Sequence, residues 1–225
     1  MKKTKKLVIV GAGETGNLAH YYFDTDSDYE VVAFSEEKAY LKENTYQGLP
    51  VVPLEELEVL YPPKEFEAFV ASGSAELSKL RTRLYLECKK KGYTMASYIS
   101  SKAFIGGQTT IGDNCFILED NTIQPFVKIG NNVTLWSGNH IGHQSEIGDH
   151  CFITSHVVVS GYVKIGRNCF IGVNTSIANN LEIGDYCLIG LGSVIPKSLE
   201  SFSIVKAPYA KKQPINTKQF CHLDI

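Results

Sequence analysis

The sequence contains no apolar run long enough to cross a membrane. Its longest uninterrupted apolar runs have the length of residues 7–10. Because a transmembrane helix needs about 20 apolar residues, we expect no membrane insertion. The charged residues 1–6 are followed by only four apolar residues before a glycine-rich turn, which is too short for a secretion signal. We therefore expect a cytoplasmic protein.

An excess of charge of one sign is also missing. The 225 residues include 22 basic and 24 acidic side chains, which gives a net charge of -2. Nucleic-acid-binding proteins usually carry a basic patch or stripe, so we expect no nucleic-acid partner. No two of the six cysteines are spaced as C-x-x-C, which argues against a zinc knuckle or a thioredoxin-like motif.

The C-terminal half does have a hexapeptide repeat. Every sixth position from Ile105 to Ile195 is aliphatic, sixteen positions in succession, and glycine follows many of them. A period of six fits neither a helix nor an ordinary strand. It fits a triangular parallel β-helix in which each coil spans three repeats and contains three short strands. We predict this prism for residues 101–198, with the aliphatic side chains along its axis.

Small or narrow side chains recur at the fourth place after the aliphatic positions. Four cysteines, Cys115, Cys151, Cys169 and Cys187, occupy such places. A thiol in this environment behaves as a compact apolar group. We therefore assign these cysteines to the inner packing of the prism and expect neither a disulfide nor a metal role for them.

The first hundred residues alternate between strand and helix patterns. The pattern predicts strands at 7–10, 30–37, 68–73 and 94–100, a short strand and helix within 48–57, a helix after the first glycine turn, and a helix at 75–92. Alternation of this kind is typical of an α/β unit. It predicts a small, Rossmann-like, doubly wound parallel sheet for residues 1–100.

A glycine-rich turn joins the first predicted strand to the first helix. Gly11, Gly13 and Gly16 match G-x-G-x-x-G, a turn that presents backbone N–H groups and a helix N-terminus to a phosphate. Glu36 follows Gly16 at about the distance, roughly 20 residues, at which a dinucleotide-binding protein has its ribose-binding acid. Only about a hundred positions precede the prism, which is short for a dinucleotide fold, so we favour a nucleoside diphosphate over NAD.

The unbroken hexapeptide repeat resembles that of the left-handed β-helix acyltransferases. With the small Rossmann-like unit before it, the chain resembles the bacterial sugar acyltransferases grouped with the sialic acid O-acetyltransferases, and among them the N-acetyltransferases of nucleotide-linked 4-amino-6-deoxy sugars. The resemblance implies a homotrimer with acetyl-CoA in the groove between neighbouring prisms. It also implies that residues 1–100 hold the nucleotide-linked sugar, with residues 199–225 as a C-terminal tail.

The resemblance assigns residues to these sites. The family's catalytic motif H-[ED]-x-x-I-G falls on His143 to Gly148, with Gln144 in place of the family's carboxylate. Gln144 accepts a hydrogen bond but has no charge, so it should support the imidazolium more weakly. By the same resemblance, substrate binding falls on Gly11, Gly13, Glu14, Thr15, Ser35, Glu36 and Gly73, and contacts to CoA fall on Gly161, Val173 and Leu191.

The segment 137–150 contains three of the six histidines, and the register of the repeat separates them. His143 lies two places after an aliphatic residue, His140 lies one place before one, and His150 lies three places after one. Gly161 stands exactly one coil after His143 and should leave space beside its imidazole. No two histidines are separated by one coil, the spacing that stacks residues on the prism, so we expect no metal site.

These features predict acetyl transfer from acetyl-CoA to the 4-amino group of a UDP- or dTDP-linked 4-amino-4,6-dideoxy sugar in bacterial surface glycan biosynthesis. His143 would act as general base, since the ordinary pKa of histidine, about 6.5, suits this role. Two alternatives remain open: acetylation of a sugar hydroxyl, as in the sialic acid branch, and a trimer that only binds a nucleotide. A hydroxyl demands a stronger base than an amine, so Gln144 favours the amine.

Overall fold

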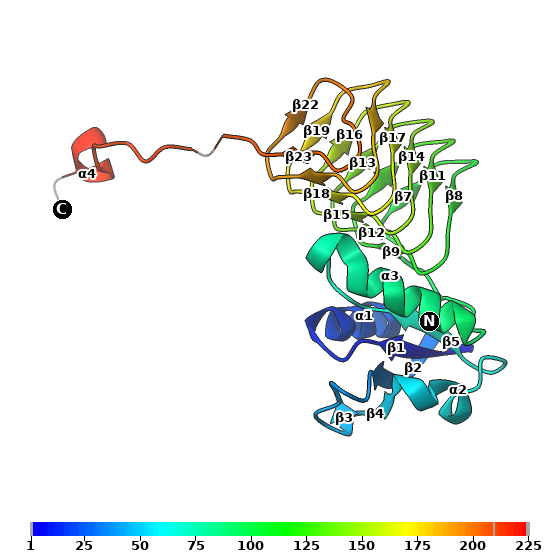
Figure 1. Cartoon of the computed structure of the whole chain (residues 1–225). Coiled ribbons are helices and arrows are strands. Elements are labelled where there is room, and N and C mark those ends of the chain that lie inside the picture. Colours follow the sequence, from blue (N-terminus) through cyan, green and yellow to red (C-terminus); the bar gives the residue numbers. More distant parts are fainter. Residues whose placement is uncertain (1, 209, 224–225) are drawn as a thin grey trace.

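The computed structural model describes residues 2–208 and 210–223; residues 209 and 224–225 of the predicted tail lie outside the described residues. Figure 1 shows a small α/β unit, a prism of stacked short strands above it, and an extended C-terminal segment. Within the described ranges, no helix has the length and apolar character needed to cross a membrane.

The N-terminal sheet has the strand order β3-β4-β2-β1-β5. Its parallel strands are β1 (Lys5–Val10), β2 (Tyr29–Glu36), β4 (Leu49–Pro53) and β5 (Glu67–Val70), and the edge strand β3 (Thr45–Tyr46) is antiparallel to β4. Leu7 and Ile9 pack with α1 (Glu14–Thr25) on one face, whereas Val8 and Val10 pack on the other with α3 (Ala75–Lys90), η1 (Leu54–Glu56) and α2 (Leu57–Leu60). The predicted doubly wound sheet is confirmed.

The predicted fifth strand of this sheet, residues 94–100, is wrong. Only Met95 forms an isolated bridge with Ala68 of β5. The chain then leaves the sheet, and β6 (Tyr98–Ile99) pairs in parallel with β9 (Phe116–Ile117) of the prism. Tyr98 is buried there and its hydroxyl donates to Asp26 at 2.8 Å. An apolar alternation predicts a strand but does not reveal which sheet the strand joins.

The following residues wind into a left-handed parallel β-helix, as predicted. Strands one coil apart, such as β10 and β13, pair in parallel and form three sheets: face 1 (β7-β10-β13-β16-β19-β22), face 2 (β8-β11-β14-β17-β20) and face 3 (β6-β9-β12-β15-β18-β21-β23). We name the three edges of the prism by the faces that they join: edge 1–2, edge 2–3 and edge 3–1. The chain turns at each edge, and many of these turns have positive φ.

Each strand from β7 to β22 consists of two residues and ends at one of the sixteen aliphatic positions of the repeat. These strands, together with β23, are β7 (Phe104–Ile105), β8 (Thr110–Ile111), β9 (Phe116–Ile117), β10 (Thr122–Ile123), β11 (Lys128–Ile129), β12 (Thr134–Leu135), β13 (His140–Ile141), β14 (Glu146–Ile147), β15 (Phe152–Ile153), β16 (Val158–Val159), β17 (Lys164–Ile165), β18 (Phe170–Ile171), β19 (Ser176–Ile177), β20 (Glu182–Ile183), β21 (Leu188–Ile189), β22 (Val194–Ile195) and β23 (Ile204–Val205).

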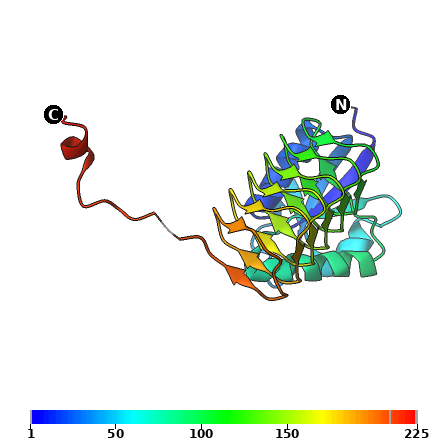
Figure 2. The same cartoon turned by 90° about the horizontal axis from the view of Figure 1, so that it is seen from above.

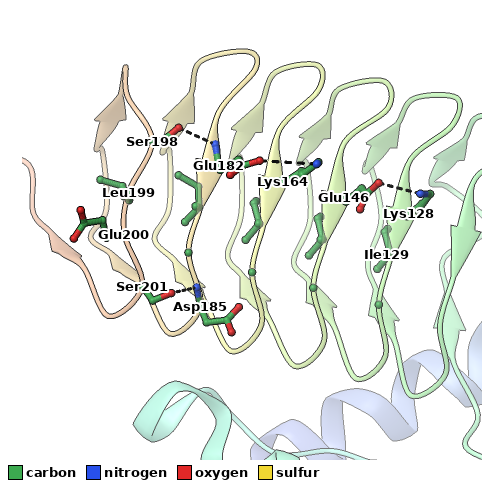
Figure 3. Close-up of a pocket in the computed structure, with 17 residues that line it drawn as sticks. Lys128, Ile129, Glu146, Lys164, Glu182, Asp185, Ser198, Leu199, Glu200 and Ser201 are labelled. Atoms are coloured by element: carbon green, nitrogen blue, oxygen red, sulfur yellow. Dashed lines mark hydrogen bonds and ion pairs between the residues drawn. The ribbon is translucent and has the colours of Figure 1, made fainter.

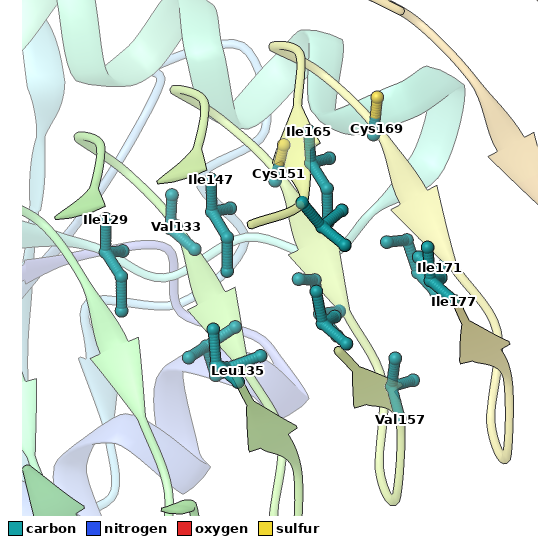
Figure 4. Packing of buried hydrophobic residues seen from close by; sticks show 14 of the residues in the cluster. Ile129, Val133, Leu135, Ile147, Cys151, Val157, Ile165, Cys169, Ile171 and Ile177 are labelled. Atoms are coloured by element: carbon teal, nitrogen blue, oxygen red, sulfur yellow. The ribbon is translucent and has the colours of Figure 1, made fainter. Parts of the chain in front are cut away.

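The core of the prism consists of these aliphatic side chains and the small residues between them (Figure 4). The small residues also satisfy backbone groups. Cys151 Sγ donates to the carbonyl of Gly166 at 3.0 Å, and Ser145 Oγ donates to that of Ser160 at 2.9 Å. Burial raises the pKa of Cys115 to about 12, so this thiol stays protonated and unreactive. The cysteines therefore serve the packing of the prism, as the repeat predicts.

The N-terminal unit packs against face 3. Phe116 and Leu118 of the prism share a buried cluster with α1 and β1. From α3, the guanidinium of Arg81 donates to Thr134 Oγ1 and to the carbonyl of Cys151, the latter at 3.0 Å. From α1, Tyr22 Oη donates to Glu119 Oε2 at 2.7 Å. Face 3 is therefore the covered side of the prism.

Beyond β23 the chain leaves the prism, and its last described element is the short helix α4 (Thr217–Phe220). Figure 2 shows this segment extending away from the rest of the molecule. Asn216 caps α4 by accepting from the backbone N–H of Gln219 at 2.9 Å. The segment adds one strand to face 3 through β23 and otherwise extends outward.

Candidate functional site

The glycine turn lies at the carboxyl end of β1, where open α/β sheets bind ligands. Gly11 has a φ of +118°, and a Cβ there would lie 2.3 Å from the carbonyl oxygen of Ala71. A Cβ at Gly16 would lie 2.0 Å from the carbonyl oxygen of Gly11. Both positions therefore require glycine for the tight turn and the close approach of α1.

The N-terminus of α1 beside this turn is free for an anion. Gly13 is the N-cap of the helix and supplies no side-chain cap, and open space surrounds the position of its missing Cβ. Glu14 and Thr15 form the first turn of α1, and Gly73 follows β5 as an exposed residue. Unpaired N–H groups and the helix dipole favour a negatively charged group at such a place. The turn can therefore hold a phosphate.

Glu36 ends β2 beside the glycine turn. Its Oε1 accepts a hydrogen bond from the backbone N–H of Ala12 at 2.6 Å. The carboxylate lines a cavity of about 400 Å³ together with Ala12, Tyr40, Leu41, Lys42, Glu43, Thr45, Tyr46 and Val51. Ser35, the other predicted substrate residue on this strand, is completely buried, and its side chain lines neither this cavity nor the adjacent one around Leu80.

His143 lies on edge 1–2, between β13 and β14, with its side chain exposed. Its backbone N–H donates to Gln124 Oε1 at 2.8 Å. A Cβ at Gly161 would lie 2.7 Å from Cε1 of the imidazole, and the ring of Tyr162 meets the imidazole edge-on with 5.0 Å between the centroids. Gly161 thus gives the imidazole its space, as the spacing of one coil predicts, while Tyr162 limits its rotation.

Gln144 gives His143 no direct support. It is exposed, has a φ of +56°, and its backbone N–H donates to the carbonyl of Pro125 at 3.3 Å. In residues 2–208 and 210–223, no side chain forms a hydrogen bond with the imidazole of His143. Packing, rather than a carboxylate, therefore holds the ring.

The predicted CoA contacts divide between two edges of the prism. Gly161 lies next to His143 on edge 1–2, whereas Val173 and Leu191 lie above one another on edge 3–1. Val173 is 40% exposed and Leu191 is 64% exposed. One chain therefore does not bring all three residues together. The two edges flank face 1, so a groove that includes both needs a second prism.

Edge 1–2 is also opposite face 3, on which the N-terminal unit packs. The glycine turn and Glu36 belong to that unit, so they lie on the other side of the prism from their own His143. Within one chain, the predicted sugar-binding residues and His143 are therefore separated by the prism.

The sequence does not single out an open groove on face 2. This groove has a volume of about 1020 Å³, and Figure 3 shows a ladder of alternating charges along it. Lys128 pairs with Glu146 at 2.9 Å, and Lys164 pairs with Glu182 at 3.9 Å. The spacing of one coil between successive members of this ladder is the signal that would have found it. Exposed ion pairs of this kind contribute little stability.

The remaining histidines of the cluster lie apart from His143. His140 belongs to face 1, and His150 on edge 2–3 lies against Tyr85 with its Nδ1 3.0 Å from Asn132 Nδ2. His156, on edge 3–1, lies over Gly138. Among the described residues, no three histidine, cysteine or acidic side chains are grouped as a metal site would require.

Comparisons with known proteins agree with this architecture. The family model described as bacterial transferase hexapeptide (six repeats) matches residues 108–143, 126–161 and 162–197. A comparison with curated protein sequences gives no match. The predicted hexapeptide repeat is thereby confirmed for these segments.

Several solved structures share the fold of nearly the whole chain. The acetyltransferase domain of PglB from Neisseria gonorrhoeae superposes with a TM-score of 0.80 at 20% identity, covering 89% of this chain and 96% of that one. PerB from Caulobacter crescentus, solved with CoA and GDP-perosamine, gives 0.79 at 20% identity, with coverages of 88% and 92%.

WeeI from Acinetobacter baumannii gives a TM-score of 0.75 at 22% identity, covering 89% of this chain and 96% of that one. The TM-scores of these three structures show that they share the fold of this chain. The chain is thus an α/β unit followed by a left-handed β-helix, and its residues 108–197 carry the bacterial transferase hexapeptide repeat.

Proposed function

We propose that this protein is an acetyl-CoA-dependent N-acetyltransferase. Its acceptor is the 4-amino group of a UDP- or dTDP-linked 4-amino-4,6-dideoxy sugar used in bacterial surface glycans, and the reaction is cytoplasmic. The observation that carries the proposal is the exposed His143 on an edge of a hexapeptide prism, with its imidazole over Gly161. An open phosphate turn beside Glu36 on the same chain supports a nucleotide-linked acceptor.

The comparisons support the same chemistry. PerB was solved with CoA and GDP-perosamine, and the PglB acetyltransferase domain was solved with acetyl-CoA. Structures of the perosamine N-acetyltransferase also include variants in which one histidine is replaced by asparagine or alanine. The two proteins share the fold, and PerB was solved with both kinds of ligand that the proposal needs.

In the proposed reaction, the neutral amine of the sugar attacks the thioester carbonyl of acetyl-CoA. His143 accepts the proton that the nitrogen loses as the tetrahedral intermediate forms, and the C–S bond then breaks to release CoA. The transfer is direct, so no residue forms a covalent acyl intermediate. A neutral amine is already a good nucleophile, which is consistent with an imidazole that no carboxylate supports.

We further propose that the active protein is a homotrimer with acetyl-CoA between neighbouring prisms. In this arrangement edge 1–2 of one subunit, with His143, faces edge 3–1 of the next, with Val173 and Leu191. Face 1 lies between these edges, and its outward residues are uncharged apart from the titratable His140: Phe104, Thr122, His140, Val158, Ser176 and Val194. The sugar is then presented by the N-terminal unit of the neighbouring subunit.

Mass spectrometry of reaction products tests the proposed function. The protein and its His143→Ala variant are incubated with acetyl-CoA and a panel of UDP-, dTDP- and GDP-linked 4-amino-6-deoxy sugars. We expect one acceptor to gain an acetyl group with the wild type and not with the variant. Transfer of the acetyl group to a sugar hydroxyl would support the O-acetyltransferase alternative instead. A protein that does not bind acetyl-CoA would support the alternative of a trimer that only binds a nucleotide.

A further inference from the structure

The imidazole of His143 lies where a second subunit can reach it. The side chain is exposed on edge 1–2, and within the described ranges no side chain of its own chain forms a hydrogen bond with the ring. A neutral imidazole that accepts a proton at one nitrogen carries an N–H on the other, and an acceptor for this N–H fixes the orientation of the ring. In the proposed trimer, the surface that faces the ring is edge 3–1 of the neighbouring prism.

The hexapeptide repeat determines which residues of edge 3–1 stand at the height of His143. Strands one coil apart pair in parallel, as His140 does with Val158, so successive coils are about 4.8 Å apart. Rotation about a threefold axis parallel to the prism leaves the height of each residue unchanged. Ser137 precedes His143 by one repeat, a third of a coil, and therefore stands only about 1.6 Å below it.

Ser137 belongs to a hydrogen-bonded group on edge 3–1. Its Oγ donates to Oε1 of Glu119, one coil below, at 2.7 Å. The other carboxylate oxygen, Oε2, accepts from Oη of Tyr22 on α1 at 2.7 Å. The carboxylate is thus held from two sides, and Ser137 Oγ keeps lone pairs that can accept a further hydrogen bond.

Glu119 supplies a negative charge behind the Ser137 hydroxyl. Burial opposes its ionisation, but its two hydrogen bonds and the nearby Lys102 outweigh this effect and lower the pKa of Glu119. The other titratable side chains on this stretch of the edge are Asp120 and His156. Among the described residues, neither of them forms a hydrogen bond with Ser137 Oγ. The charge that reaches the hydroxyl through a hydrogen bond is therefore that of Glu119.

These two residues lie on the same line of edge 3–1 as the predicted CoA contacts. Val173 stands two coils above Ser137, and Leu191 stands one coil above Val173. A CoA molecule that lies along Val173 and Leu191 can therefore extend toward Ser137 and the His143 that faces it. The hydroxyl and the imidazole of two chains would then meet at the acyl end of the groove.

We propose that Ser137 and Glu119 of one subunit form a relay that positions the imidazole of His143 in the next subunit. Ser137 Oγ accepts the hydrogen bond of the ring N–H and donates to Glu119, whose charge stabilises the imidazolium once the ring has accepted the proton of the amine. Both are positioning residues, since neither touches a reacting atom. The inference rests on the proposed function and adds to it a carboxylate that acts through a hydroxyl from a second chain, where Gln144 provides none.

The pH dependence of kcat/KM tests the relay, with acetyl-CoA and the amino sugar that gains an acetyl group in the product assay. Glu119→Gln removes the charge and keeps an acceptor for Ser137, whereas Ser137→Ala removes the link to the imidazole. Without the charge, the imidazolium loses its proton more readily, so the acid limb should move to lower pH by about half a unit to one unit. The weaker base should also lower the alkaline plateau by about threefold to tenfold.

Two further variants distinguish the relay from a general effect of charge or of structure. Asp120→Asn is the matched control, because Asp120 is an exposed neighbour of Glu119 and has a φ of +59°, which asparagine adopts readily. It should keep the profile of the wild type. Adding Gln144→Glu to Glu119→Gln supplies a charge from the other side of the ring and should return the acid limb toward its wild-type position, which a merely structural role of Glu119 would not allow.

Co-expression assigns the relay to two chains. Ser137→Ala is combined with the inactive His143→Ala, so that every intact His143 belongs to a chain without Ser137. Where the neighbouring subunit is His143→Ala, its intact Ser137 faces that imidazole. Part of the activity should therefore regain the wild-type profile, whereas a relay within one chain would leave the profile of Ser137→Ala unchanged.

The outcomes separate this inference from the proposed function. Wild-type profiles for both Glu119→Gln and Ser137→Ala would overturn the relay and leave the acetyltransferase intact. Ser137→Ala keeps the bond between Tyr22 and Glu119, so it tests the relay even where Glu119→Gln assembles poorly. A wild-type protein that acetylates no amino sugar would contradict the proposed function, and the relay with it.

Discussion

The imidazole of His143 is positioned by packing against Gly161 and Tyr162. Activity should therefore be sensitive to a substitution at Gly161. We expect Gly161→Ala to lower kcat by about tenfold to a hundredfold. The new Cβ would lie 2.7 Å from Cε1 of the imidazole, so the ring would have to move out of the position in which it accepts the proton. The backbone of Gly161 does not have positive φ, so alanine strains only the side-chain contact.

Steady-state kinetics with a matched control checks this expectation. Gly107 lies on the same edge, two coils before His143, and no atom lies within 4 Å of the position of its missing Cβ. Gly107→Ala should therefore keep the wild-type kcat. Equal rates for Gly107→Ala and Gly161→Ala would show that the space beside the imidazole is not needed.

The absence of a carboxylate beside His143 gives a second expectation for a single residue. In Gln144→Glu, a negative charge next to the imidazole favours its protonated form. The acid limb of the kcat/KM profile should therefore move to higher pH, with an increased rate on the alkaline side. A profile identical to that of the wild type would mean that the side chain at 144 does not reach the imidazole.

At the scale of elements, His150 joins edge 2–3 of the prism to α3. Burial lowers the pKa of His150; Asp149 opposes this effect, while Arg81 and Arg167 add to it. Since the folded protein binds a proton here less readily than the unfolded chain, unfolding takes up protons in slightly acidic solution. The contribution of neutral His150 is complete above the ordinary pKa of histidine, about 6.5, and is lost as the pH falls from there through the lowered pKa of the folded state.

We therefore expect the thermal midpoint of the wild type to fall between pH 7.5 and pH 5.5 by more than that of His150→Asn. Asparagine suits this position, because Asn114, Asn132 and Asn168 occupy the same place in neighbouring coils with positive φ. His20, whose pKa burial also lowers, is present in both proteins and cancels in the comparison. If the thermal midpoints of the wild type and of His150→Asn fell by the same amount across this pH range, His150 would not be the group that titrates.

The same scale separates what the sequence could predict from what it could not. The prism follows from its repeat, since every coil needs an aliphatic residue at each sixth position, and the length of one coil places Gly161 beside His143. The prediction for residues 94–100 fails because alternating apolar residues fit a strand of the N-terminal sheet and a strand of the prism equally well. The contact of Arg81 with Thr134 is one of those that join the two units, and no periodic pattern records it.

For the whole molecule, the position of the N-terminal unit on face 3 has a direct consequence for catalysis. If the sugar of one subunit reaches His143 of the next, two inactive variants can restore each other. Gly13→Asp disables nucleotide binding by placing a charge at the phosphate turn, while aspartate remains a favourable N-cap for α1. His143→Ala removes the base and leaves the nucleotide site.

Each variant alone should be inactive, and their co-expression should recover activity. In a ring of three subunits with sites shared between neighbours, random mixing gives about one quarter of the sites an intact N-terminal unit and an intact His143. Sites built within single chains would recover none, because every chain carries one of the two substitutions. Mixing the separately purified variants is the control, since preformed assemblies that do not exchange subunits should stay inactive. Recovery on co-expression, absent in that control, would therefore require an active site that belongs to two chains, consistent with the two edges over which the predicted CoA contacts are divided.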